Sequence, residues 1–312
     1  MTNLPQSPFH EGELAVQERA GETELAAHNG RILGDEVPAG ARGFLSRQPM
    51  LVVASADREG RLWASLLLGQ PGLVSTADGR LVTLDLGRAR PAAWDPLGDT
   101  LTAGAEVGLL AIELSTRKRL RINGTVVARD DARVEVAVHE AFPNCPKYIQ
   151  RRTRAPGADA PEAAALDVRQ GVALDAAAQA RVARADTVFV ASRHAERGLD
   201  ASHRGGPPGF VHVTGARTLR IPDYPGNGMY NTLGNLAVDP AVGLLVMDFA
   251  ERRAVQITGR ADLRFDEPDA GGLTGGTGRF WQVEVDGWRD APLAAGPSWQ
   301  LVETSPYNPP GA

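Results

Sequence analysis

Short apolar runs separated by turn residues dominate the first half of the chain. They are rich in Val, Leu and Ile and lie at residues 51–56, 61–68, 81–86, 109–114 and 120–128. Gly, Asp and Pro bound these runs, and the polar sequence STRKR at 115–119 predicts a hairpin turn between the last two. Because little helical pattern interrupts the runs, they predict a mainly β fold with a closed barrel rather than a parallel sheet.

The same pattern occurs a second time along the chain. VGLLAIELSTRKRLRING at 107–124 corresponds to VGLLVMDFAERRAVQITG at 242–259. VVASADREGRLWAS from Val52 matches VFVASRHAERGLDAS from Val188, and GQPGLV from Gly69 matches GPPGFV from Gly206. Matching segments in the same order indicate a duplication. We therefore expect two barrels of one kind, the first over residues 44–150 and the second over 186–312.

Helical patterns lie outside these two repeats. Residues 11–30 predict a helix that ends at Gly30, inside an N-terminal helical segment 1–43. Residues 161–185 are rich in Ala and predict a second helix. It would lie in a linker over 151–185, with a domain boundary marked by the Ala, Pro, Gly and Asp residues at 155–160.

Length, charge and cysteine content exclude several classes of protein. A chain of 312 residues is long for one core and favours two domains. The net charge of −5 disfavours a nucleic-acid partner. Cys145 is the single cysteine, so no intrachain disulfide can form. The N-terminus lacks the pattern of a signal peptide, and no apolar run approaches the roughly 20 residues of a membrane helix. We expect a soluble, cytoplasmic protein.

The second repeat resembles the FMN-binding split barrels related to pyridoxamine phosphate oxidase. The segments that carry the resemblance are DASHRGGPPGFVHV at 200–213, LRIPDYPGNGMYNTLGNLAVDPAVGLLVMDF at 219–249 and AVQITGRADL at 254–263. They follow the family's order: a strand with a polar end, a Gly/Asn loop, a short helix ending in Asp-Pro, an apolar strand and a hairpin closing on Gly. FHEGELAVQERAG at 9–21 and NCPKYIQRR at 144–152 are similar to segments of a two-barrel subfamily.

The resemblance implies one FMN bound where the two barrels meet, because barrels of this family dimerise and a tandem copy forms a pseudo-dimer within one chain. An Arg fork with hydroxyl and backbone donors suits a phosphate, and the Asn/Gly loop leads into a helix N-terminus. The expected cofactor-binding residues are Ser202, His203, Arg204, Gly205, Ile221, Pro222, Asp223, Asn227, Gly228, Met229, Asn231, Thr232, Asn235 and Gln256. An ordinary turn with a capped helix is the plain alternative.

The first repeat lacks the polar loop and carries LDLGRARPAAWDPLGD at 84–99 instead. Arg88 and Arg90 are the cations there, while Pro91 removes a backbone donor and Trp94 adds bulk. We therefore expect one flavin per chain, bound to the second copy.

Lys147 and Tyr148 are the candidate catalytic residues. In a pseudo-dimer their segment can reach the site of the second copy, where Lys147 would polarise the flavin or a substrate anion and Tyr148 would line the ring. A basic surface strip before the linker is the alternative. Cys145 as a redox nucleophile is disfavoured, since nothing in the sequence indicates a lowered pKa of its thiol.

The function predicted from the sequence is an FMN-dependent oxidoreductase with a small-molecule substrate and NAD(P)H or another reductant. A non-enzymatic carrier of flavin or haem and a deazaflavin-dependent reductase stay open, as does a homodimer of the chain. Other motifs fail. GGLTGGTG at 271–278 precedes a strand-like run and lacks the Lys-Ser/Thr of a phosphate loop. The six histidines lack paired ligand spacing, so no metal is expected, and Gly-x-Ser-x-Gly is absent.

Overall fold

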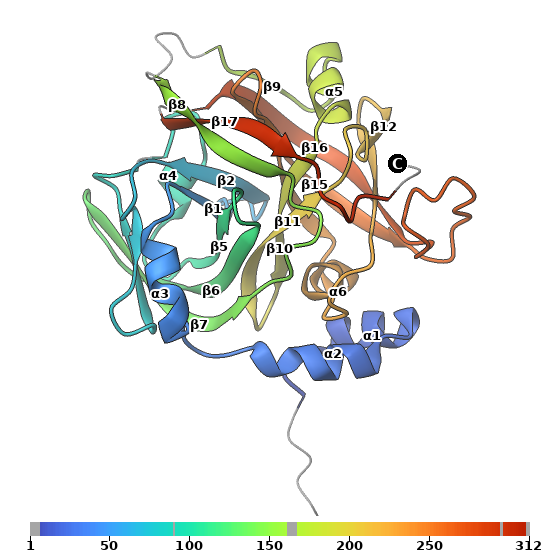
Figure 1. Cartoon of the computed structure of the whole chain (residues 1–312), viewed down its shortest axis with the longest axis horizontal. Coiled ribbons are helices and arrows are strands. Elements are labelled where there is room, and N and C mark those ends of the chain that lie inside the picture. The colour runs from blue at the N-terminus through green and yellow to red at the C-terminus, as the bar shows by residue number, and fades with distance from the viewer. Residues whose placement is uncertain (1–6, 90, 161–166, 294–295, 310–312) are drawn as a thin grey trace, which may run out of the picture.

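Two antiparallel β-sheets form the bulk of the computed structural model (Figure 1), which describes residues 7–89, 91–160, 167–293 and 296–309. The strands of the first sheet are β1 (Met50–Ala56), β2 (Leu62–Leu68), β3 (Val74–Ser75), β4 (Leu81–Asp85), β5 (Glu106–Glu113), β6 (Lys118–Arg129) and β7 (Arg133–Pro143). Those of the second are β10 (Thr187–His194), β11 (Gly198–Gly205), β12 (His212–Gly215), β13 (Thr218–Pro222), β14 (Ala241–Asp248), β15 (Arg253–Arg264) and β16 (Phe280–Pro292).

The two sheets share one topology. Their strand orders are β2-β1-β5-β6-β7-β4-β3 and β11-β10-β14-β15-β16-β13-β12. Each strand of the first sheet therefore has a counterpart at the same place in the second. The pairing register also repeats, since Ala54 faces Gly108 in the first sheet and Ala191 faces Gly243 in the second. The short helices α4 (Leu97–Thr100) and α6 (Asn231–Val238) occupy matching places in the two copies. The duplication and the mainly β, two-barrel fold are therefore confirmed.

Three apolar clusters form the cores of the two barrels and the contact between them. One fills the first barrel around Leu109 and Val136, and one fills the second around Trp281 and Val255. The third contains side chains from both copies, among them Leu110 and Phe189, and forms the contact between the barrels. Alternating residues of a strand face opposite sides, so one side of β5 packs inside its own barrel while the other packs against the partner barrel.

Glycines allow the two barrels to approach at equivalent points. A Cβ on Gly108 would lie 2.6 Å from the backbone nitrogen of Ala201 in β11. A Cβ on Gly243 would lie 2.7 Å from the carbonyl oxygen of Leu62 in β2. In the first contact β5 of the first barrel meets β11 of the second, and in the other contact the equivalent strands β14 and β2 meet with the two barrels interchanged. A pseudo-twofold axis requires such a pair of equivalent contacts.

The N-terminal segment forms two helices where the sequence predicts one. They are α1 (Glu11–Ala20) and α2 (Thr23–Asn29), followed by the short η1 (Gly30–Ile32) and by α3 (Ala39–Ser46). Gly21 ends α1 in the left-handed conformation with φ of 70°, and its backbone N–H bonds to carbonyl oxygens of the last turn. In Figure 1 the blue α1 lies beside α6 of the second barrel. None of the helices in the described residues is long and apolar enough to cross a membrane.

The segment between the barrels differs from the predicted helical linker. The start of the predicted linker, including the predicted boundary at 155–160, forms β8 (Arg151–Ala160), which pairs with the C-terminal β17 (Gly296–Glu303). β9 (Arg169–Gly171) then adds to β16, and the helix is only α5 (Ala176–Ala183). The Asp175 side chain caps α5 by accepting from Ala178 N–H, which sets its start. Residues 161–166 of the predicted helix lie outside the described residues.

Gly108→Ala is expected to lower the free energy of unfolding by about 1–3 kcal/mol, because the added methyl group would overlap the backbone of β11. Denaturant unfolding of the purified variant measures this change. Gly98→Ala is the matched control, since nothing lies within 4 Å of a Cβ at that position in α4. Equal stabilities of the two variants would contradict the close approach of the barrels.

Candidate functional site

A polar pocket lies where the second barrel meets the first. It contains about 730 Å³ of unfilled space and is open toward solvent. Its walls come from β6, the segment 144–148, the end of β11, the loop 223–230 and the start of α6. The lining residues are Arg119, Arg121, Asn144, Cys145, Lys147, Tyr148, His203, Arg204, Gly205, Asp223, Tyr224, Gly226, Asn227, Gly228, Tyr230, Asn231 and Thr232. We call it the interface pocket.

Three arginines converge on the interface pocket. Arg119 and Arg121 are two residues apart on β6 of the first barrel, so they share one face of the strand, and Arg204 comes from β11 of the second. Burial, Arg121 and Arg204 together lower the pKa of Arg119 to about 9. Burial also lowers the pKa of Arg204. The nearest carboxylate to Arg121 is Asp200, at 3.5 Å. A cluster of cations that depress one another's pKa is a site prepared for an anion.

His203 adds a neutral donor to this cluster. Burial first, and then Arg119 and Arg204, hold its pKa well below the ordinary value, so the ring is uncharged. Its Nδ1 lies 3.3 Å from Arg119 Nη1 and must accept, since a guanidinium can only donate. The proton of the neutral ring is therefore on Nε2, which is buried and has no partner among the described residues.

Other polar atoms of the interface pocket are buried without partners in the described part of the chain. They are Arg204 Nε, Asn144 Nδ2 and the hydroxyls of Tyr224 and Tyr230. Buried polar groups are nearly always hydrogen-bonded in folded proteins. So many open donors around one cavity indicate that a polar ligand completes it.

The loop 223–230 is held in place by the N-terminal helices. Asn29 in α2 donates to the carbonyl oxygen of Asn227 at 2.7 Å, and Gln17 in α1 donates to that of Met229 at 3.1 Å. Asn227 turns the loop by accepting from Met229 N–H at 3.1 Å. Tyr230, with φ of 59°, then starts α6. The N-terminal segment therefore belongs to the scaffold of the pocket.

The segment 144–148 brings the candidate catalytic residues to the pocket. A Cβ on Gly205 would lie 2.0 Å from the carbonyl oxygen of Tyr148, so only glycine allows this approach. Tyr148 donates its hydroxyl to Pro225 O at 2.9 Å. Burial raises the pKa of Tyr148 to about 12, so it stays protonated. The Lys147 ammonium lies 5.6 Å from the ring centre of Tyr307.

The structure brings most, but not all, of the sequence-predicted residues together. In the interface pocket are Lys147, Tyr148, His203, Arg204, Gly205, Asp223, Asn227, Gly228, Asn231 and Thr232. Ser202, Ile221, Pro222, Met229, Asn235 and Gln256 do not line it. Ser202 supports it from behind, since Thr232 donates to its hydroxyl at 2.9 Å. Ile221 and Met229 are fully buried in apolar clusters.

Sequence reasoning missed Arg119 and Arg121, as well as Asn144, Tyr224 and Tyr230. A signal for the two arginines exists, because an Arg-x-Arg pair on a predicted strand places two charges on one face. That face looks toward the other barrel, and this was not deducible without the packing of the two copies.

Gln256 requires a correction, because it lies at the pseudo-equivalent position on the opposite side of the interface. It pairs with Leu245 of β14 as Arg121 pairs with Leu110 of β5. Its amide donates to Ala64 O, Ser65 Oγ and Asp95 Oδ2 at 2.9–3.0 Å. Gln256 of the second copy therefore hydrogen-bonds residues of the first copy. The reason is that β6 and β15 each face the other barrel.

The pseudo-equivalent side also lacks the other groups of the pocket. By strand register, Leu66 and Leu67 take the places of His203 and Arg204. Arg88 is turned to the surface and pairs with Asp85 at 3.3 Å. Arg90 lies outside the described residues.

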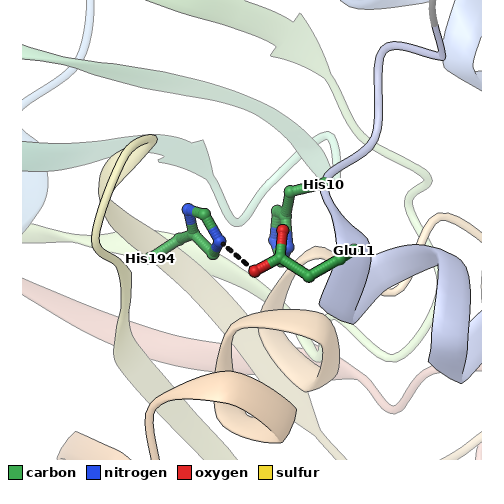
Figure 2. Close-up of side chains that lie close together, drawn as sticks. All are labelled: His10, Glu11 and His194. Carbon is green, nitrogen blue, oxygen red and sulfur yellow. Dashed lines mark hydrogen bonds and ion pairs between the residues drawn. The ribbon is translucent and has the colours of Figure 1, made fainter.

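A separate cluster of His10, Glu11 and His194 has the composition of a metal site (Figure 2). Gly12 N–H donates to His10 Nδ1 and Glu196 N–H donates to His194 Nδ1, so both rings carry their proton on Nε2. Each Nε2 then donates, one to Asn235 and the other to Glu11. Coordination through Nε2 would move the protons to Nδ1, against the two backbone N–H groups. The donor set does not fit a metal ion, and the cluster docks α1 on the second barrel.

Fold and pocket define a two-barrel protein with a pocket between its halves that three arginines line. Residues 174–275 match the family model described as pyridoxamine 5'-phosphate oxidase. The matched residues lie in the second barrel and in the segment just before it, and the match agrees with the resemblance that this repeat carries. No curated protein matches the sequence.

Several solved structures align with part of the chain. A variant of HupZ from Group A Streptococcus aligns over 38% of this chain and 98% of its own, with 11% identity and a TM-score of 0.31. A FAD-binding protein from Mesorhizobium loti covers 40% and 99%, with 16% identity and a TM-score of 0.26. A Clostridium acetobutylicum protein of the pyridoxinephosphate oxidase family covers 39% and 90%, with 10% identity and a TM-score of 0.27.

Asp95 lies beside Gln256 at the pseudo-equivalent position of the interface, and its ionisation makes the stability of the protein depend on pH. Burial raises its pKa from 3.8 to about 6, so the folded protein keeps a proton that the unfolded chain has lost. Its contribution to stability is fully present below pH 3.8 and is lost as the pH rises through about 6. The stability of the wild type relative to Asp95→Asn should therefore fall between pH 4 and 7 in denaturant unfolding. Asp99→Asn, an exposed change in α4, should show no such trend. A flat difference for Asp95→Asn would disprove the shift.

Proposed function

We propose that the interface pocket binds FMN and that the chain is an FMN-dependent oxidoreductase acting on a small molecule. The observation that carries this proposal is the set of unpaired donors beside three arginines. A phosphate dianion offers the acceptors that Arg204 Nε and His203 Nε2 lack. The match to an oxidase family supports the same reading.

A flavin bound there would supply hydride or electron transfer. Arg204 and the two arginines of β6 would hold its phosphate, and His203 would donate through Nε2. The backbone of the loop around Gly226 and Gly228 is open enough for close approach of the ligand. Because β6 belongs to the first barrel, both copies would contribute to one bound molecule.

The remaining side chains of the pocket have fixed protonation near neutral pH. The pKa of Tyr148 is raised to about 12, and burial also raises the pKa values of Tyr224 and Tyr230. The lowered pKa of His203 keeps that ring neutral. These groups would therefore orient and donate hydrogen bonds rather than exchange protons. Lys147 is then the residue placed to polarise the flavin or attract an anionic substrate.

Fixed protonation also suits a carrier without catalysis, which is the second candidate function. The absorption spectrum of the purified protein distinguishes flavin from haem and from deazaflavin. Addition of NADH or NADPH without oxygen then tests catalysis, because reduction bleaches a flavin. A flavin that neither nucleotide nor another cellular reductant bleaches would favour the carrier.

Arg204→Ala is expected to weaken FMN binding about ten- to hundredfold, because a charged hydrogen-bond donor to phosphate is worth roughly 1.5–3 kcal/mol. Fluorescence titration measures the affinity. Riboflavin, which lacks the phosphate, should lose little affinity in the same variant. Arg220→Ala is the matched control, since Arg220 lies on β13 of the same barrel and pairs with Glu267. An equal loss for FMN and riboflavin would refute the phosphate role of Arg204.

One flavin per chain is expected, because Gln256, Asp95 and Ser65 fill the pseudo-equivalent side of the interface and hydrogen-bond one another there. Leu67 further replaces the arginine that the phosphate needs. Heat release of the flavin and its quantification against protein concentration gives the ratio. A ratio near two would mean that the closed side opens and binds as well.

A further inference from the structure

A second, smaller cavity lies directly behind the interface pocket. It contains about 290 Å³ of unfilled space and is lined by His10, Glu13, Asn123, Glu140, Arg197, Gly198, Asp200, Asn231 and Asn235. We call it the rear cavity. Asn231 lines both spaces, and the ion pair of Arg121 with Asp200 joins them.

The rear cavity contains acceptors that no donor satisfies. Both carboxylate oxygens of Asp200 are buried without a hydrogen bond in the described part of the chain, although the residue is only 3% exposed. Asn123 is 6% exposed and donates its amide nitrogen to Glu140 at 3.3 Å. That bond fixes the orientation of the amide, and Asn123 Oδ1 is left without a partner. Three open oxygen acceptors in one small space call for a donor or a positive charge.

The charges around the rear cavity are acidic in sum. Glu13, Glu140 and Asp200 face it, against the guanidinium groups of Arg197 and Arg121. Arg197 is already paired with Glu140 at 3.1 Å. His10 adds no charge, because burial and His194 lower its pKa to about 4.

We propose that the rear cavity binds a small hard cation through the open oxygens of Asp200 and Asn123. Carboxylate and amide oxygens are the ligands that alkali and alkaline-earth ions prefer. The one nitrogen facing the cavity, His10 Nε2, donates its proton to Asn235 Oδ1 at 3.0 Å, so a nitrogen-seeking metal finds no ligand.

The cation would also act on the interface pocket. With its charge balanced by the cation, Asp200 no longer competes for Arg121, which lies 3.5 Å away and faces the pocket. Cation and phosphate would then bind cooperatively. This coupling rests on the proposed function, whereas the cation site does not.

The test uses flavin-free protein, with MgCl₂, CaCl₂, NaCl and KCl compared against choline chloride at equal ionic strength. Thermal unfolding and calorimetry should show saturable binding of at least one cation. Asp200→Asn should weaken it about tenfold or more. Asp262→Asn, an exposed carboxylate on the same barrel, should leave it unchanged.

A fold effect of Asp200→Asn is controlled with Asn123→Asp, which adds a negative ligand and should strengthen binding. No saturable effect of any cation, or equal effects in all variants, would mean that the rear cavity holds only water. Cation binding without a change in FMN affinity would overturn the coupling alone. Absence of FMN binding with cation binding intact would overturn the proposed function instead.

Discussion

The close packing of two like barrels is the constraint on which the rest of the structure depends. Gly108 and Gly243 let the second strand of each barrel contact the fifth strand of the other at backbone distance. The shared apolar cluster is completed only by side chains from both copies. This contact places β6 of the first barrel against β11 of the second and so creates the interface pocket. The site is a property of the pair, since each barrel supplies only part of the cation cluster.

A pseudo-twofold relation creates two equivalent positions at the interface between the barrels. Only one of them has the arginines and the histidine of the interface pocket. Arg121 and Gln256 occupy equivalent places on β6 and β15, yet one faces an open pocket and the other a filled one. On the filled side, Ser65 donates to Asp95 at 2.5 Å and Gln256 donates to both. A covalent pair is free to diverge in this way, because a substitution in one copy is not repeated in the other. A symmetric dimer of identical chains lacks that freedom.

The interface pocket is electrostatically unfavourable when empty. Burying cations beside one another without matched anions raises the free energy of the folded state, and the lowered pKa of Arg119 expresses that strain. The N-terminal helices fix the scaffold of the pocket through Asn29, Gln17 and the Glu13–Asn231 hydrogen bond. Asn231 lines both the interface pocket and the rear cavity. Arg121 and Asp200 lie 3.5 Å apart between the two spaces, so a charge in one space acts on the other over a short distance.

The sequence alone determined the duplication, five strands of the first copy, the short helix after the Asn/Gly loop and the presence of Arg204 at the end of a strand, but not β3 or β7. These features are local, since the apolar pattern, turn residues and repeated segments are readable along the chain. The tertiary structure decided how the copies meet. Pairing of β8 with β17 joins segments more than a hundred residues apart, and no local pattern encodes that pairing. Arg121 and Gln256 carry no sign in the sequence of which one faces an open pocket. That depends on the side chains that the other barrel brings to each, and only the packed pair of barrels defines them.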